Sequence, residues 1–227
     1  MNNTAIQENT GINAFYARIY SLVGIGIGLS ALVSFLMLTV FQEAMVNVLI
    51  NARWLVWGSW LVEMALVFAA SSQAMKNSPS ALPLFLGYSA LNGFTLSFTL
   101  AMYRGTSVFS AFVSSSILFF VMAIIGRFSK KDLSGVGQAA LAGLFGVIIA
   151  GVVNLFLHSS GLSFILSIVT VLIFAGLIAW DNQKIRYVYE QTGGNVGNGW
   201  AVSMALSLYL DFINLFLSLL RIFARND

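Results

Sequence analysis

Long apolar runs constrain this sequence more than any other feature. A helix needs about 20 apolar residues to cross about 30 Å of hydrocarbon. Seven runs reach that length: Phe15–Val40, Trp54–Ser72, Ala81–Tyr103, Val108–Gly126, Gln138–Leu157, Leu162–Trp180 and Trp200–Phe223. Only 8% of the 227 residues are charged and 59% are hydrophobic, so a water-soluble fold of this size could not cover its surface with charges. The sequence predicts an all-α integral membrane protein with seven transmembrane helices.

The predicted organisation is a single seven-helix domain over residues 15–223. A short polar N-terminal tail, residues 1–14, precedes it, and a C-terminal tail, residues 224–227, follows it. The longest polar stretch, Asp181–Gly199, follows the sixth run. Two three-helix units plus a seventh helix would also fit the order of the runs.

The distribution of lysine and arginine predicts the orientation in the membrane. Cytoplasmic loops carry an excess of these residues. With the N-terminus inside, the cytoplasmic side holds Arg18, Lys76, Arg127, Lys130, Lys131, Lys184 and Arg186, and the outside holds Arg53, Arg104, Arg221 and Arg225. We therefore expect a cytoplasmic N-terminus and an external C-terminus. The net charge of +3 then reflects cytoplasmic loops, and no nucleic-acid partner is expected. The absence of cysteine excludes disulfides and thiolate sites.

Three carboxylates lie in or beside apolar runs, where a charge costs at least about 2.5–3.5 kcal/mol. Glu63 lies in the middle of the second run, Asp211 lies well inside the seventh, and Asp181 follows the sixth. Asp181 has a competing interpretation, as a solvated helix end beside Lys184 and Arg186. Two neighbouring carboxylates cannot both ionise cheaply and can share a proton. Such a pair would also be a weak calcium site, because Ca²⁺ prefers oxygen ligands.

Polar residues recur on one face of the last run. Ser203, Ser207, Asp211, Asn214 and Ser218 follow one another at helical spacing, and the third run adds Ser89, Asn92, Thr95 and Thr99. These stripes either bond neighbouring helices together or line a water-accessible path. Asp211 favours the path, because a packing contact does not need a carboxylate. Small residues at four-residue spacing, Gly24 with Gly28 and Ala142 with Gly146, predict close helix packing.

Four segments together resemble the Bax inhibitor-1 family, over about Phe15 to Phe223. They are Ile173–Ile185, Ala205–Phe216, Phe85–Ser97 and Gly126–Ser134. The resemblance implies a seven-helix bundle with a central seventh helix and no enzymatic activity. It also implies a pH-sensitive calcium leak channel gated by Asp181 and Asp211, with Glu63 lining the path and no cofactor beyond the transported calcium. Relatives carry an arginine latch near the end of the second helix, where this sequence offers only Lys76. The short length is similar to that of bacterial relatives, which implies a bacterial plasma membrane.

Two other classes of membrane protein share some of these features, but the sequence lacks their defining residues. Presenilin-like proteases also use two aspartates, but the residues before Asp211 lack their Gly-x-Gly pattern. A retinal protein needs a Schiff-base lysine in the seventh helix, and Trp200–Phe223 has none. A non-transporting regulator that binds another membrane protein, such as a membrane protease, stays open as the alternative. Polar residues buried on the last helix would favour a leak path for calcium and protons.

Overall fold

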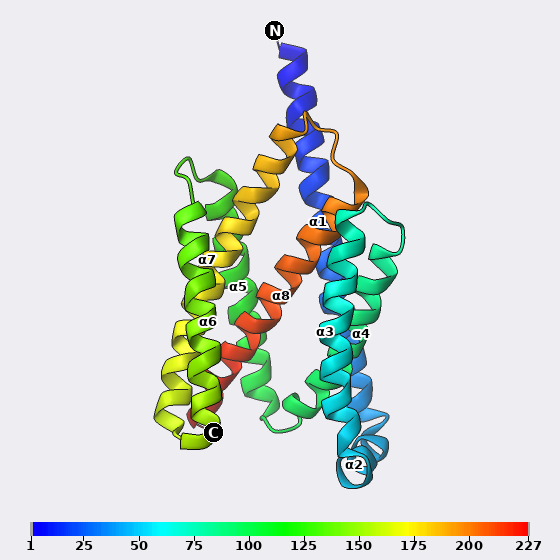
Figure 1. The fold of residues 1–227 in the computed structure, drawn as a ribbon, viewed down its shortest axis with the longest axis vertical. Coiled ribbons are helices and arrows are strands. Elements are labelled where there is room, and N and C mark those ends of the chain that lie inside the picture. Colours follow the sequence, from blue (N-terminus) through cyan, green and yellow to red (C-terminus); the bar gives the residue numbers. More distant parts are fainter. Residues whose placement is uncertain (1, 227) are drawn as a thin grey trace. The chain divides into compact units, whose positions relative to one another are not determined.

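The computed structural model describes residues 2–226 and the side chains of residues 11–225 (Figure 1). Every regular element in that part of the chain is helical. The helices are α1 (Asn2–Thr39), α2 (Gln42–Asn51), α3 (Arg53–Met75), α4 (Ala81–Leu100), α5 (Gly105–Phe128), α6 (Ser134–Leu157), α7 (Ser160–Gln191) and α8 (Asn198–Phe223), followed by a 3₁₀ turn, η1 (Ala224–Asn226). The all-α class is confirmed.

Each predicted apolar run overlaps one of the seven long helices, but α1 begins at Asn2, before its run, and α7 continues to Gln191, beyond its run. Six of the seven are long and apolar enough to cross a membrane, which supports an integral membrane protein. The exception is α4, whose buried Ser89, Asn92 and Thr95 lower its mean hydropathy. The expected tail, residues 1–14, is helical from Asn2 onward.

The sixth helix is longer than its apolar run. The polar stretch Asp181–Gly199 follows this run, and α7 continues into it as far as Gln191. Ile185 and Val188 are buried and extend the apolar face of the helix by two turns. Polar residues between them find partners, as the Asn182 side chain donates to the Ile178 carbonyl at 2.8 Å. Asp181 therefore lies inside a helix and is buried.

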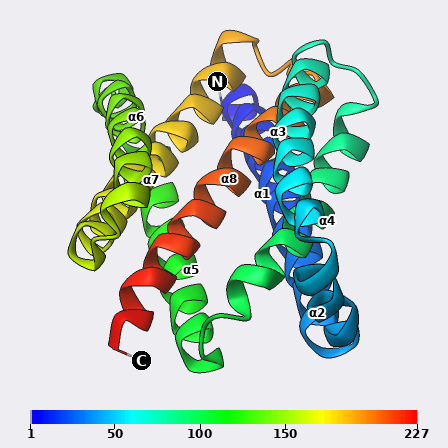
Figure 2. The same cartoon turned by 60° about the horizontal axis from the view of Figure 1, so that its bottom comes forward.

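The chain divides into two compact units. Unit 1 holds residues 1–102 and 192–209, and unit 2 holds residues 103–191 and 210–227. In unit 1, α1 and α3 both pack on α4, while in unit 2, α5 and α6 both pack on α7. Figure 2 shows α6 alongside α7 and α3 alongside α4. The first half of α8 belongs to unit 1 and the second half to unit 2, so the division coincides with three helices plus three and a shared seventh.

Burial distinguishes α8 from the other candidate spans. Of its most apolar window 67% is buried, against at most 39% in the other five. A helix that is apolar on most faces and buried along its length has little contact with lipid. The polar side chains of α8 are therefore surrounded mainly by protein.

Glycines mark the closest helix contacts, although not the ones expected from spacing. A Cβ atom at Gly93 of α4 would lie 2.5 Å from the Ser30 carbonyl oxygen of α1, and a Cβ at Gly126 of α5 would overlap the Ala179 backbone of α7. By contrast, a Cβ at Gly24, Gly28 or Gly146 would meet no atom within 4 Å. The predicted packing role of the Gly24–Gly28 and Ala142–Gly146 pairs is therefore wrong for contacts within the described chain.

The contact at Gly93 gives a direct test of the packing in unit 1. Replacing Gly93 by alanine forces α4 away from α1, because backbone rather than a flexible side chain meets the new methyl group. We expect a loss of about 1–3 kcal/mol of stability, the usual cost of overpacking. Thermal unfolding of the purified variant in detergent measures it. Gly28→Ala is the matched control and should leave the melting temperature unchanged; equal shifts in both would contradict the packing described.

Candidate functional site

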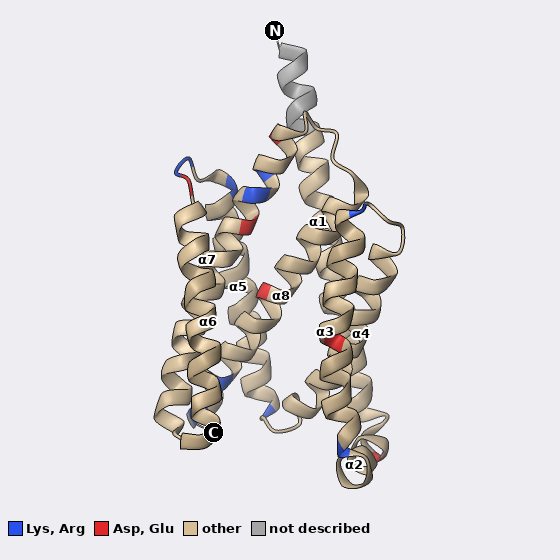
Figure 3. Cartoon of the chain, viewed as in Figure 1, with Lys and Arg blue, Asp and Glu red and all other residues tan. Residues whose placement is uncertain are grey.

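Asp181 and Asp211 come from neighbouring helices of the same unit. Asp181 lies on α7 and Asp211 on the part of α8 that belongs to unit 2. The two side chains are 8% and 6% exposed, and Asp181 is the neighbouring charge that acts on Asp211. Figure 3 shows how sparse acidic residues are along the helices. The structure thus brings the two predicted aspartates into one buried region.

Asp211 is buried, and the described residues leave its carboxylate partly unsatisfied. The next residue, Phe212, meets Phe112 and Phe119 of α5 edge to face at 5.9 and 5.7 Å between ring centroids. The Asp211 Oδ2 atom is buried and has no hydrogen-bond partner among the described residues. A buried carboxylate oxygen without a partner is costly when it is ionised. This site therefore needs a proton, a water molecule or a cation beside Asp211.

The donor set can hold a cation only weakly. No group of three or more histidine, cysteine or acidic side chains in the described chain could hold a metal ion. Ca²⁺ normally takes six to eight oxygen ligands. Asp181 and Asp211 would supply only some of these, so they fit brief contact with a passing ion better than a resident metal. The shared-proton hydrogen bond between them stays a prediction.

Glu63, the third predicted carboxylate, lies in a separate polar network within unit 1. It is half-buried on α3 and accepts a hydrogen bond from the Thr95 hydroxyl of α4 at 2.5 Å. The Asn92 side chain, one turn before Thr95, donates a second. Both donors belong to the polar stripe predicted on the third run. Hydrogen bonds to the carboxylate offset part of its cost in a membrane helix.

Tyr209 extends this network to two further helices. Its hydroxyl donates to Asn92 Oδ1 at 2.8 Å and lies 2.6 Å from the Ser30 hydroxyl of α1. The single hydroxyl hydrogen of Ser30 is within reach of both the Tyr209 hydroxyl and the Ser89 carbonyl of α4, which lies 2.6 Å away. The Tyr209 ring also meets the rings of Phe85 and Tyr88 edge to face. A continuous chain of hydrogen bonds therefore connects α1, α3, α4 and α8 within unit 1.

The sequence reasoning missed Tyr209, because it was grouped with the apolar faces of the last run. The signal was available, since a buried tyrosine hydroxyl usually needs a partner. The predicted stripe on α8 is less uniform than expected. Asn214 and Ser218 bond to carbonyls of their own helix, at 2.8 and 2.7 Å. Ser203 and Ser207 are half-buried in the other half of the helix.

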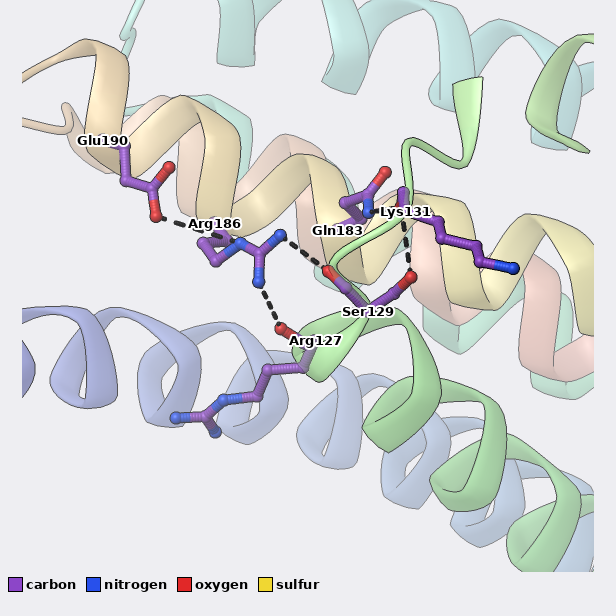
Figure 4. A network of polar contacts seen from close by, with 6 residues as sticks. All are labelled: Arg127, Ser129, Lys131, Gln183, Arg186 and Glu190. Carbon is purple, nitrogen blue, oxygen red and sulfur yellow. Dashed lines mark hydrogen bonds and ion pairs between the residues drawn. The ribbon is translucent and has the colours of Figure 1, made fainter. Parts of the chain in front are cut away.

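A second group of polar contacts holds the loop between α5 and α6 against α7 (Figure 4). The Arg186 guanidinium donates to the carbonyls of Arg127 and Ser129, each at 3.0 Å. The Gln183 amide donates to the Lys131 carbonyl at 2.7 Å and accepts from the Leu133 N–H at 2.8 Å. These two side chains lie on the part of α7 beyond its predicted apolar run.

Comparison with known proteins agrees with the helical architecture. Residues 12–227 match the family described as "Inhibitor of apoptosis-promoting Bax1". The chain belongs to the Bax inhibitor-1 family. It is 58% identical over 221 residues to an uncharacterized membrane protein of Streptococcus pyogenes serotype M1, covering 97% of this chain and 96% of the relative. It is 49% identical over 217 residues to YrjE of Lactococcus lactis, covering 96% and 93%.

The family also includes a protein named for its location. This Bax inhibitor-1 protein is 34% identical over 228 residues to the inner membrane protein YbhL of Escherichia coli, covering 99% of this chain and 97% of YbhL. The predicted family is therefore confirmed, and so is the broad class of membrane protein. These relatives do not establish an activity for this chain.

The network around Tyr209 predicts a specific stability effect in this Bax inhibitor-1 protein. Tyr209→Phe keeps the ring contacts but leaves the buried Asn92 side chain without its donor. We expect a loss of about 1–3 kcal/mol, the usual cost of one unsatisfied buried polar group. Thermal unfolding in detergent measures it. Tyr187, which is 58% exposed, provides the control, and Tyr187→Phe should be neutral; an equally neutral Tyr209→Phe would show that the network contributes nothing.

Proposed function

We propose that this Bax inhibitor-1 protein is a pH-sensitive cation leak channel that passes calcium down its gradient. In this proposal the paired aspartates of α7 and α8 form the gate, and the protein is not an enzyme. It lies in a bacterial plasma membrane with its N-terminus in the cytoplasm and its C-terminus outside. The family resemblance first pointed to this function, and the burial of Asp181 and Asp211 in one unit supports it.

The observation that carries the proposal is the unsatisfied Oδ2 atom of Asp211. Burying a carboxylate without a partner lowers stability, so a purely structural role would favour asparagine or an apolar residue at this position. An ion path explains why a carboxylate is present, because a proton or a cation can lie beside Asp211 Oδ2, where the described residues supply no partner. Asp181 is the carboxylate whose charge acts on Asp211, and Lys184, one turn further along α7, acts on Asp181.

The gate then follows from the chemistry of two close carboxylates. A pair that holds one proton can form a short, charge-assisted hydrogen bond, which would hold α7 and α8 together. Loss of that proton, or gain of a second, removes the bond. Since the two groups titrate as a unit, the leak would depend on pH even though no histidine takes part.

The proposed topology treats α4 as a seventh span. Its polar side chains do not oppose this, since Ser89, Asn92, Thr95 and Ser97 are all buried rather than facing lipid. An odd number of spans places the two termini on opposite sides. Basic residues then set the direction, because they are more frequent at the ends assigned to the cytoplasm.

Substituting the aspartates tests the gate. Asp211→Asn keeps the shape and removes the ionisable group, so calcium flux into liposomes should lose its pH dependence near neutrality. Asp181→Asn should have the same effect. The double variant should add little to either, because both changes disable one unit. Glu43→Gln, an exposed carboxylate on α2, is the matched control and should retain the wild-type profile.

Two results would contradict the proposal. Independent, additive effects of the two substitutions would show that the aspartates do not act as a pair. Absence of calcium flux in the folded wild-type protein at every pH would favour the alternative, a non-transporting regulator that acts through another membrane protein.

Glu63 provides a separate test of the path. Glu63→Gln preserves the hydrogen bond from Thr95 but removes the charge, so the fold should persist and calcium permeation should decrease. Flux assays with calcium and with a monovalent cation separate an effect on charge selection from a general block. If the flux of each ion through Glu63→Gln equals its flux through the wild type at every pH, the residue only connects α3 to the network of Asn92 and Tyr209.

A further inference from the structure

A cavity of about 540 Å³ lies within unit 2 at the end of α7 and beside the loop that joins α5 to α6. Asp181, Asp211 and Glu63 do not line it. Its wall includes three basic residues, Lys130, Lys184 and Arg186, and two aromatic residues, Trp180 and Tyr187. The volume is within the range of small-molecule sites, about 300–1,000 Å³. The proposed channel therefore does not account for this cavity.

The cavity is held in shape by contacts that are already formed. Arg186 and Gln183 fix the loop that carries Lys130 through four hydrogen bonds between their side chains and the backbone. Figure 4 shows three of them, to the carbonyls of Arg127, Ser129 and Lys131. The Trp180 ring packs against Gly137 of α6, where a side chain would overlap it. Lys184 lies over that ring, with its ammonium 5.3 Å from the centroid. A ligand would therefore need to order few further groups in the cavity wall.

The charged side chains that line the cavity differ in the ion pairs and hydrogen bonds that they already make. Glu190 faces Arg186 at 3.8 Å, and no ion pair in the described part of the chain involves Lys130 or Lys184. Asp132 also lines the wall. Hydrogen bonds from the hydroxyl and the backbone N–H of Ser134 hold the pKa of Asp132 below its usual value. Its charge is partly satisfied at the start of α6. The two lysines are then the groups that can meet an anion, and Lys184 also acts on Asp181 and lies over the Trp180 ring.

We propose that this cavity binds the phosphate of an anionic phospholipid headgroup, with Lys130 and Lys184 as the ligands for the phosphate. Basic pockets between helices at a membrane surface are a known way of holding such headgroups. In this arrangement Arg186 and Gln183 are positioning residues, because they act through the loop that carries Lys130.

The surroundings favour a lipid over a soluble phosphate. Tryptophan, tyrosine and lysine are the residues that concentrate where a helix leaves the hydrocarbon. On α6, Val136 follows the cavity residue Ser134 by two positions, is exposed and packs beside Gly176 of α7. An acyl chain could lie against Val136 while its phosphate meets the lysines. A soluble phosphate would use only the polar half of the site.

The test measures binding of phosphatidylglycerol and phosphatidylcholine with identical acyl chains to the full-length protein in uncharged detergent, by native mass spectrometry. Wild type should prefer phosphatidylglycerol. Each lysine near a membrane surface contributes about fivefold in affinity for anionic lipid, so Lys130→Gln with Lys184→Gln should remove most of that preference. Lys131→Gln is the matched control, since Lys131 carries the same charge in the same loop but does not line the cavity. Asp132→Asn should act in the opposite sense and tighten binding.

The outcomes separate the alternatives. An unchanged preference in the double variant, or an equal loss in Lys131→Gln, would overturn the site and leave only general attraction to basic loops. Displacement of the lipid by glycerol phosphate at equal concentration would overturn the lipid assignment in favour of a soluble phosphate ligand. These measurements involve no ion flux, so the site stands or falls independently of the proposed channel.

Discussion

Hydrocarbon cannot donate or accept a hydrogen bond, and this constraint governs where each polar side chain of the protein lies. A polar group on a membrane helix must find its partner inside the protein. Many of the serines and threonines bond to a carbonyl one turn earlier, as Ser115 and Thr170 do at 2.6 and 2.7 Å. Others reach a second helix, and Ser34 of α1 donates to the Gly93 carbonyl of α4 at 2.7 Å. Those interhelical bonds form where a glycine allows close approach.

The two units satisfy their buried polar groups to different degrees. In unit 1, Glu63 reaches Tyr209 through Asn92, and each member of that chain has a partner. In unit 2, Asp211 keeps one buried oxygen without a partner. A satisfied network makes a fold more rigid, whereas an unsatisfied carboxylate lowers its stability. The proposed gate therefore includes a buried oxygen that, unlike the network of unit 1, has no partner among the described residues.

The polar end of α7 shows the same constraint beyond its apolar run. Arg186 and Gln183 bond to loop carbonyls that no helix satisfies, and in doing so they close one wall of a basic cavity. The side chains of Arg186 and Gln183, which hydrogen-bond to the loop backbone, thus also position the basic residues of the cavity. On α7, the buried Asp181 directly follows Trp180, and the cavity is lined by residues between Trp180 and Glu190. The proposed gate and the proposed lipid site therefore use the same stretch of one helix.

The sequence by itself determined the membrane class, the seven long helices and the three carboxylates of interest, because apolar runs and isolated charges are local patterns. It also placed Asn92 and Thr95 on one polar face. It could not show that α7 continues past Trp180, since Ile185 and Val188 count as apolar face only once a neighbouring helix covers them. It assigned close packing to Gly24 and Gly28, whereas Gly93 and Gly126 make the contacts. Only the tertiary structure decided which helix each face meets, and hydrogen bonds such as that from Tyr209 to Asn92 join residues too far apart in the sequence for any periodic pattern to reveal.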